Sequence, residues 1–346
     1  MIYRPLVGAV FALITLSFWL QTAPAAEATL CNDARTGLDC RLDQRKPAFT
    51  EPEIPENSIV KDVTYGWIED YAYFYDKPER GARHVRTAST GFFYGPAVDE
   101  ATDAEGNKWY KVWGYWLPAR YYHIVEASDF GGVEVNRQPL RPFGWVVKPV
   151  VPSAAPGEEP AGGAELPRYT FVQVSQSRAA GGVIWHDIGN EQWVRHDTVA
   201  IMQVRERPDA VGRDEFWVEV DLTEQTFAAY EGDRMVFAGL VSSGLNRWAT
   251  RQGLNQVWER RLLAPMQGGV VGDDYYYIDD VAHSLYYDGE IALHGAFWHD
   301  DFGRQKSHGC VNMAPRTAEW VYEWSENAPN DLWVWVHYAN IAEFLQ

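Results

Sequence analysis

The alternation of apolar and polar residues predicts a mainly β chain. Residues 216–222 divide into two side-chain sets, Phe216, Val218, Val220 and Leu222 on one face and Trp217, Glu219 and Asp221 on the other. A period of two residues is that of a half-buried strand. Gly232 and Asp233 then separate two apolar-rich runs, which predicts a hairpin in which glycine supplies the positive φ. The runs EIALHG (290–295) and DLWVWVHY (331–338) predict two further strands.

One segment of this region has the pattern of a helix instead. In APRTAEWVYEWSEN, residues 314–327, Pro315 suits the first helical turn, and Ala318, Val321 and Trp324 fall on one face. We therefore expect a β-rich domain with one or two short helices.

An internal repeat of tryptophans precedes this domain. Its three pairs are Trp67 with Trp145, Trp109 with Trp185, and Trp116 with Trp193, at offsets of 78, 76 and 77 residues. One register explains all three pairs, which indicates duplicated units. Short alternating runs separated by Gly, Pro and Asp predict that each unit is a small β-barrel. The first copy, with its pattern G-W…W-x-x-x-x-G-x-W-L-P-A, resembles bacterial SH3-like domains.

These patterns predict five segments along the chain. They are a signal peptide at 1–26, a linker at 27–56, a first SH3-like module at 57–138, a second at 139–210, and a β-rich domain at 214–342. The linker is broken by Pro47, Pro52 and Pro55, and the second module contains a Pro- and Gly-rich loop at 152–166.

The N-terminus predicts export. Arg4 precedes an apolar run from Leu6 to Leu20, and Ala23-Pro24-Ala25 is a small-residue cleavage pattern. The alternative, an uncleaved membrane anchor, is disfavoured because the run is shorter than the roughly 20 residues of a spanning helix. We therefore expect a periplasmic or cell-wall location and no stable membrane insertion after cleavage.

The predicted location determines the chemical state expected for the three cysteines. Paired cysteines become disulfides in an oxidising compartment, and Cys31 and Cys40 are close enough in sequence to close a small loop. Cys310 is then left unpaired, which calls for a chemical explanation. The composition also argues against one class of binding partner. The formal charge of −18 disfavours nucleic acid, because binding its phosphates requires concentrated Lys and Arg.

The neighbours of Cys310 favour nucleophilic chemistry. A thiol reacts as its thiolate, and histidine is a natural partner near neutral pH. His308 stands two residues before Cys310, and His294 ends a predicted strand. Amides at Gly309 and Cys310 could donate to a developing oxyanion. Two alternatives are a tight turn with a core cysteine, and a zinc site of His294, His299, His308 and Cys310, although their spacing follows no common zinc pattern. His299, Asp300 and Asp301 otherwise read as a solvated loop.

Candidate substrate contacts lie on both sides of His294. Residues 268–289, rich in Tyr, Asp and Gly and including Tyr276, are interpreted as a mobile flap or as a plain hairpin. Phe297 and Trp298 follow His294 and could contact substrate or lie in the core. The sequence contains no Gly-rich phosphate loop, so we expect no cofactor.

The motif HG…SHGCVN, formed by His294, Ser307, His308, Gly309, Cys310 and Asn312, resembles the signature of the L,D-transpeptidase catalytic domain, YkuD. The resemblance extends over about residues 214–340. Two features depart from the family pattern: only twelve residues separate His294 from Ser307, and Arg251 stands where many members carry Pro.

The resemblance implies a secreted cysteine L,D-transpeptidase. Cys310 would attack the carbonyl after the third residue of a peptidoglycan tetrapeptide stem and expel D-alanine, with His294 as general base. His308, Gly309, Ser307 and Asn312 would orient the site or donate to an oxyanion. An amine of a second stem would complete a 3→3 cross-link. Two alternatives remain: water as acceptor, giving a carboxypeptidase or a hydrolase that releases a wall-attached protein, and a non-catalytic wall-binding protein.

Overall fold

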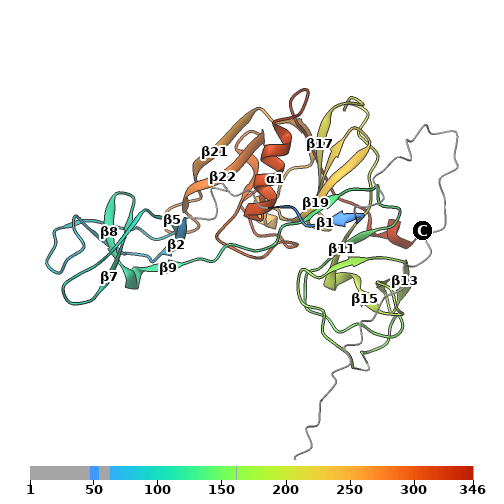
Figure 1. Cartoon of the computed structure of the whole chain (residues 1–346), viewed down its shortest axis with the longest axis horizontal. Coiled ribbons are helices and arrows are strands. Elements are labelled where there is room, and N and C mark those ends of the chain that lie inside the picture. The colour runs from blue at the N-terminus through green and yellow to red at the C-terminus, as the bar shows by residue number, and fades with distance from the viewer. Residues whose placement is uncertain (1–46, 54–62, 161, 346) are drawn as a thin grey trace, which may run out of the picture. The chain divides into compact units, whose positions relative to one another are not determined.

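The computed structural model describes residues 47–53, 63–160 and 162–345, and its architecture is mainly β (Figure 1). The predicted fold class is confirmed. The predicted signal peptide and the Cys31–Cys40 pair lie outside the described residues. Within the described part of the chain, no helix combines the length and apolar character needed to cross a membrane.

The first repeat unit contains two groups of strands. A five-stranded sheet has the order β4-β3-β8-β7-β6, while β2 pairs with β5 and β9. The elements are β2 (Thr64–Ile68), β3 (Tyr73–Tyr75), β4 (His84–Thr87), β5 (Phe92–Ala97), β6 (Asp99–Thr102), β7 (Lys108–Val112), β8 (Tyr115–Pro118), η1 (Ala119–Tyr121) and β9 (Tyr122–Ile124).

The second unit repeats this arrangement. Its sheets have the orders β12-β11-β16 and β13-β14-β15. The elements are β11 (Phe143–Val146), β12 (Phe171–Gln173), β13 (Gln176–Ala180), β14 (Val183–Asp187), β15 (Trp193–Arg195), η2 (His196–Thr198) and β16 (Val199–Met202).

The paired tryptophans occupy matching strands in the two units. Trp67 lies opposite His123 between β2 and β9, and Trp145 lies opposite Ala200 between β11 and β16. The other two pairs fall on β7 and β14, and on β8 and β15. The first unit has the hairpin β3–β4 where the second has its Pro- and Gly-rich loop. The two units thus share a strand order, and their assignment as SH3-like modules stays a prediction.

The remaining strands form the sheet that carries the motif. Its order is β20-β25-β17-β18-β19-β24-β23-β22, with β21 paired to β22. The elements are β17 (Phe216–Asp221), β18 (Thr226–Glu231), β19 (Arg234–Ser242), η3 (Asn246–Trp248), β20 (Gly253–Gln256), β21 (Glu259–Gly268), β22 (Tyr276–Asp288), β23 (Ile291–Gly295), β24 (Val311–Met313), α1 (Pro315–Ser325), β25 (Trp333–His337) and η4 (Ile341–Leu345).

The predicted elements of this region are confirmed. Glu231 pairs with Arg234 across the β18–β19 turn, where Gly232 has φ +56° and a Cβ would lie 2.1 Å from the Arg213 oxygen. Only glycine tolerates that combination without strain. Helix α1 begins at Pro315, whose missing N–H costs nothing in a first turn.

The predicted half-buried character of β17 is wrong. Glu219 and Asp221 are each only 3% exposed. Both faces of this strand are covered, since Val218 and Val220 belong to one core cluster and Trp217 to another. The second cluster includes Phe143 and Trp145 of the second module, which therefore covers the face that alternation alone assigned to solvent.

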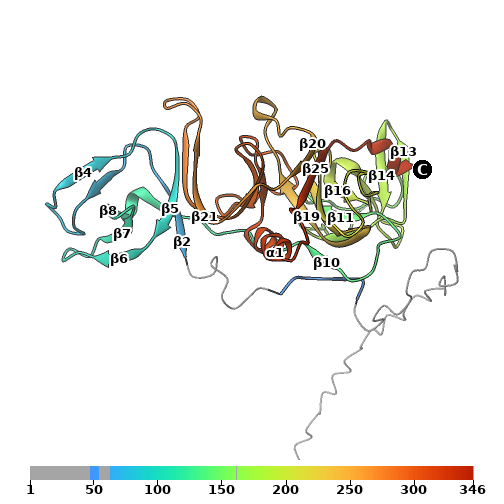
Figure 2. The ribbon, with the colours of Figure 1, turned by 90° about the horizontal axis from the view of Figure 1, so that it is seen from above.

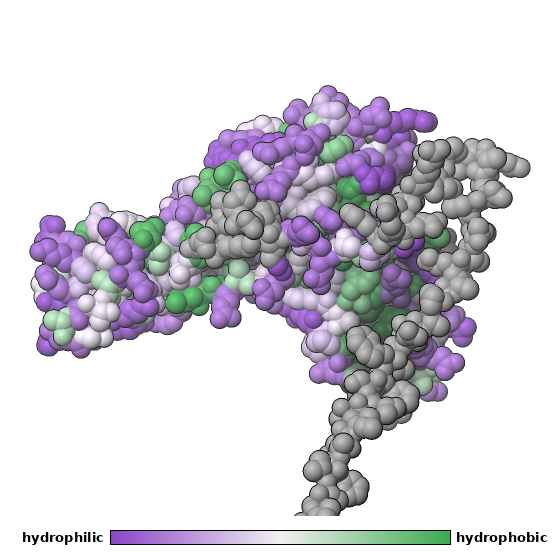
Figure 3. All heavy atoms as spheres, in the orientation of Figure 1, coloured by the Kyte–Doolittle hydropathy of each residue, from purple (hydrophilic) through white to green (hydrophobic). Residues whose placement is uncertain are grey.

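Strands from outside residues 214–342 extend the sheet. β5 of the first module pairs in parallel with β22, matching Phe92 to Tyr276. β1 (Phe49–Thr50), in the predicted linker, pairs with β10 (Val133–Val135), which in turn pairs with β19. Figure 2 shows β5 and β10 from above. On the face shown in Figure 3, hydrophilic residues cover most of the described surface, with smaller hydrophobic groups between them.

We expect Leu240→Ala to lower the free energy of unfolding by about 2–5 kcal/mol, because it empties a fully buried position in the core that β19 shares with the second module. Urea denaturation of the purified chain measures the change. Leu140→Ala, at a 92% exposed leucine, is the matched control and should change stability by less than about 0.5 kcal/mol. Equal losses in the two variants would contradict this assignment of the core.

Candidate active site

The parallel pairing of β23 with β24 brings the two halves of the motif together. Leu293 pairs with Val311 and His294 with Asn312. Leu293 and Val311 point into the core below the sheet. Since side chains alternate along a strand, His294, Asn312 and Cys310 share the opposite face. The sheet therefore juxtaposes a histidine and a thiol that lie 16 positions apart in sequence.

His294 is held as a neutral imidazole. The residue is 2% exposed, and its Nδ1 lies 3.1 Å from the Gly295 carbonyl oxygen. Nδ1–H donates to that oxygen, which leaves the lone pair on Nε2. Burial lowers the pKa of His294 to about 4, and the bond to Gly295 only partly offsets it. At neutral pH the ring has the tautomer that a proton acceptor needs.

Cys310 is a free thiol in a half-buried residue. Its Sγ lies 3.7 Å from the Glu290 carbonyl oxygen. Burial raises the pKa of the thiol to about 11, and the charge of Glu290 acts in the same direction. The resting site therefore holds a neutral thiol beside a neutral imidazole.

The SHGC turn is fixed by hydrogen bonds to Ser307 and Thr250. Ser307 Oγ donates to the Cys310 carbonyl and accepts from the Gly309 N–H at 3.0 Å. Thr250 Oγ1 donates to the Gly309 carbonyl at 2.7 Å. Gly309 has φ +122°, and a Cβ there would lie 2.8 Å from Ile291. The Gly309 N–H is thus already paired within the turn, and its donation to a bound acyl oxygen stays a prediction.

His308 lies against aromatic rings. Its ring centroid is 3.7 Å from Trp248 and 4.9 Å from Tyr276. Burial lowers the pKa of His308, which disfavours a charged ring between these two neighbours. Burial also raises the pKa of Tyr276 to about 12, with the nearby Cys310 thiolate as a second cause. Tyr276 therefore lies beside the His308 ring of the motif.

The two aromatic residues after His294 have different positions. Phe297 is 5% exposed and stacks on Tyr65 of the first module, with ring centroids 3.9 Å apart. Trp298 is half-buried and lies 5.7 Å from the His294 ring. Trp298 is therefore the better placed of the two to border a bound substrate, while Phe297 joins the first module to the site.

Residues 268–289 contain the turn and the second strand of a hairpin, and their interpretation as a mobile flap stays a prediction. β21 and β22 pair along most of their length, and Val270 N–H donates to Asp274 Oδ1 at 2.7 Å in the turn. Val270 and Val271 at the tip are about two-thirds exposed (66% and 64%).

Sequence reasoning missed two residues of this region. His299, predicted to lie in a solvated loop, is only 9% exposed, and its Nε2 lies 3.0 Å from the Asn312 carboxamide. The prediction failed because the loop turns the ring inward against Phe302, with ring centroids 4.9 Å apart, and against Asn312. Thr250, which holds Gly309, gave no signal in the sequence either, since its partner is 59 positions away.

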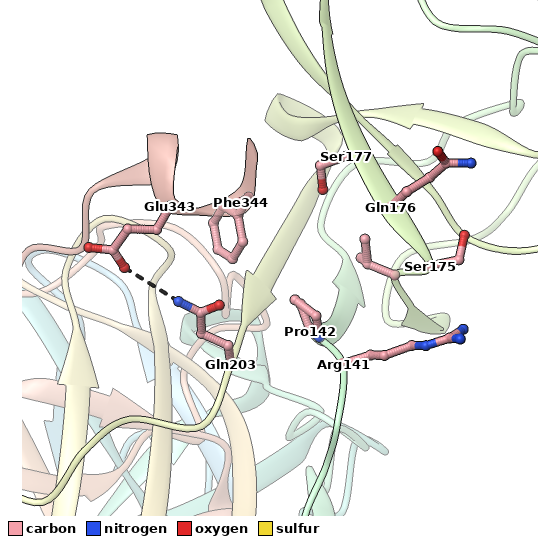
Figure 4. Close-up of a pocket in the computed structure, with 9 residues that line it drawn as sticks. Arg141, Pro142, Ser175, Gln176, Ser177, Gln203, Glu343 and Phe344 are labelled. Carbon is pink, nitrogen blue, oxygen red and sulfur yellow. Dashed lines mark hydrogen bonds between the residues drawn. The ribbon is translucent and has the colours of Figure 1, made fainter. Parts of the chain in front are cut away.

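Two other clusters lie away from Cys310. A cavity of about 570 Å³ lies between the second module and η4 (Figure 4). It is lined by Arg141, Pro142, Val174, Ser175, Gln176, Ser177, Gln203, Glu343 and Phe344, none of them a predicted site residue. Among the described residues, the group able to ligate a metal is Glu219, Asp221 and His337. Arg205 lies 3.3 Å from Glu219 and already supplies a positive charge there. Neither cluster contains the four predicted zinc ligands.

Comparison with known proteins identifies the class of domain. Residues 215–334 match the family model described as the L,D-transpeptidase catalytic domain, YkuD. The resemblance drawn from the motif is thus confirmed over this part of the chain. Among curated proteins, none matches the chain.

Several solved structures are similar to the chain. An L,D-transpeptidase from Mycobacterium smegmatis matches at 19% identity over 62% of this chain and 99% of that chain, with a TM-score of 0.33. An L,D-transpeptidase from Enterococcus faecium matches at 19% identity over 40% of this chain, also with a TM-score of 0.33. The match spans 55% of the length of the Enterococcus protein.

We expect the alkylation of Cys310 by iodoacetamide to accelerate about tenfold per pH unit from pH 7 to pH 10, because only the thiolate reacts and burial raises the thiol pKa to about 11. Intact-mass spectrometry at timed intervals gives the rate. His294→Gln is the control and should leave the profile unchanged, since the His294 ring is already neutral above about pH 4. A rate plateau between pH 6 and 8 would instead reveal a thiolate–imidazolium pair.

Proposed function

We propose that this chain is an exported cysteine L,D-transpeptidase acting on peptidoglycan stem peptides. The observation that carries the proposal is the parallel pairing of β23 and β24, which puts His294 and Cys310 on one face of a segment matching the L,D-transpeptidase catalytic domain model. The predicted signal peptide supports export to the periplasm or cell-wall space.

In the first half-reaction, Cys310 Sγ attacks the carbonyl carbon after the third residue of a tetrapeptide stem. The thiol proton passes to His294 Nε2, whose lone pair is free because Nδ1–H is bound to Gly295. The tetrahedral intermediate collapses, the C–N bond breaks, and the terminal D-alanine leaves with the proton from His294. The product is a thioester on Cys310.

In the second half-reaction, an amine of another stem attacks the thioester carbonyl and gives its proton to His294. The C–S bond breaks and the sulfur regains that proton, which restores the neutral pair. The result is a 3→3 cross-link. The resting thiol and imidazole are both neutral, which favours transfer of the proton together with S–C bond formation.

Water in place of the amine would release a tripeptide stem or a wall-attached protein. The acceptor depends on whether bound stem excludes water from the thioester, and Trp298 and Tyr276 beside the motif are the side chains placed to do so. We assign transfer to the amine, and keep hydrolysis as an outcome of the test.

We expect mass spectrometry of the wild-type protein with a disaccharide-tetrapeptide to show a transient acyl adduct, loss of D-alanine and a cross-linked dimer. Cys310→Ala should show none of these. His294→Gln should lower the rate about 10²–10⁴-fold, the usual contribution of a general base. His84→Gln, at an exposed histidine of the first module, is the matched control and should retain full activity.

The outcomes separate the hypotheses. Tripeptide without dimer would establish the hydrolytic alternative. Turnover that persists in Cys310→Ala would overturn the assignment of the nucleophile. A folded wild type that forms neither adduct nor product, while its effect on the cell wall survives Cys310→Ala, would establish a wall-binding protein.

A further inference from the structure

The loop between His294 and Cys310 contains a second buried histidine that touches the motif. His299 Nε2 lies 3.0 Å from Asn312 Nδ2 as the carboxamide is placed. Asn312 is itself 3% exposed and pairs with His294 across the sheet. His299 is therefore separated from the proposed base by a single side chain.

The hydrogen bonds of His299 determine its tautomer. The Asp301 N–H donates to His299 Nδ1 at 3.1 Å, so Nδ1 carries a lone pair. Burial also lowers the pKa of His299 to about 4, with the charge of Lys306 as the next cause, and the ring is neutral at pH 7. A neutral imidazole has one proton, which must then lie on Nε2.

The tautomer in turn orients Asn312. Because Nε2–H is a donor, the group facing it must be an acceptor, and the two ends of a carboxamide are distinguished by such bonds. Two N–H groups do not bond to each other, so the carboxamide is assigned half a turn from its placed orientation. The oxygen of Asn312 then faces His299, and the NH₂ group points away. Along the row of strands Asn312 lies between Ser242 and His294. Ser242 Oγ donates to the Asp301 carbonyl at 3.0 Å. His294 is the neighbour of Asn312 on the other side.

We propose that His299 is a positioning residue for acyl transfer: its Nε2–H fixes the Asn312 carboxamide so that the NH₂ group is presented on the catalytic face, as a donor to the acyl oxygen of the bound stem. The proposal rests on the proposed function. It assigns Asn312 an orientation that the motif alone does not specify, and it assigns His299 the role of fixing that orientation.

The second module holds the loop that carries His299. Tyr169 OH donates to Asp300 Oδ1 at 2.7 Å, and Arg168 Nη2 donates to the Phe302 carbonyl at 2.8 Å. Arg304 Nη2 donates to the Val147 carbonyl at 2.9 Å. Phe302 is fully buried in the core cluster that contains Phe143 and Trp145. The position of His299 thus depends on contacts with a module outside the matched domain.

Two substitutions distinguish the roles of the two ring nitrogens of His299. Asparagine can accept from the Asp301 N–H but is too short to reach Asn312, whereas glutamine can place an N–H near the position of Nε2. Both remove the ring, so loss of packing lowers stability alike in the two variants. We expect His299→Asn to lower kcat about tenfold or more, the effect of one lost hydrogen bond, and His299→Gln to stay within about threefold of wild type.

A substitution in the second module tests the proposal independently. Tyr169→Phe removes only the hydroxyl that bonds to Asp300, and we expect it to lower kcat about threefold or more while KM changes little. Tyr338→Phe, at a half-exposed tyrosine, is the matched control and should behave as wild type. Equal kcat values in these two variants would overturn the role of the second module.

NMR without substrate tests the proposal even if the proposed function fails. Long-range ¹H–¹⁵N spectra should show the Nε2–H tautomer of His299 at pH 7. The Asn312 carboxamide signals should remain in place in His299→Gln and move in His299→Asn. An Nδ1–H tautomer, or carboxamide signals that move equally in both variants, would overturn the proposal. So would equal kcat values for His299→Asn and His299→Gln in an active enzyme, whereas an inactive wild type would instead refute the proposed function.

Discussion

The site depends on one register, that of β23 against β24. His294 reaches the face of Cys310 because it pairs with Asn312, two residues beyond the thiol. A shift of one residue would turn the thiol or the imidazole into the core, since side chains change face at every position. Leu293 and Val311, packed below the sheet, oppose such a shift. The hydrophobic core therefore fixes the catalytic geometry, and the glycine-rich turn before Cys310 only has to fit it.

A parallel pair also imposes a crossover, because the chain must return to the start of the next strand before it can pair. Here the crossover is residues 296–310, which includes Phe297, His299 and the SHGC turn. Both modules contact it: the first stacks Tyr65 on Phe297, and the second bonds through Tyr169 to Asp300. The modules are thus part of the support of the site, which gives their duplication a structural purpose beyond any binding of cell wall.

The sequence predicted the features that depend on residues close together in the chain. It did not predict the burial and strand pairing that depend on residues far apart in the chain. The β17 strand, the β18–β19 hairpin and helix α1 follow from local periodicity and turn chemistry, and the tryptophan repeat follows from spacing. The burial of Glu219 could not be predicted, because Arg205 and His337, which contact it, come from other segments of the chain. The same holds for β1 and β5, whose edges pair with strands far along the chain. The motif located Cys310 and His294, but only the fold shows Thr250 and Asn312 in their hydrogen bonds.

Burial has two opposite effects at the reacting pair. It lowers the pKa of His294 to about 4 and raises that of Cys310 to about 11, so it disfavours the charged form of each. Both shifts disfavour a preformed thiolate–imidazolium pair. The energy to charge both groups has to come from the bound acyl group, whose developing negative oxygen needs donors in the same dry space. The fixed NH₂ group of Asn312 meets that need, which is why a histidine that never touches the substrate can matter to the chemistry.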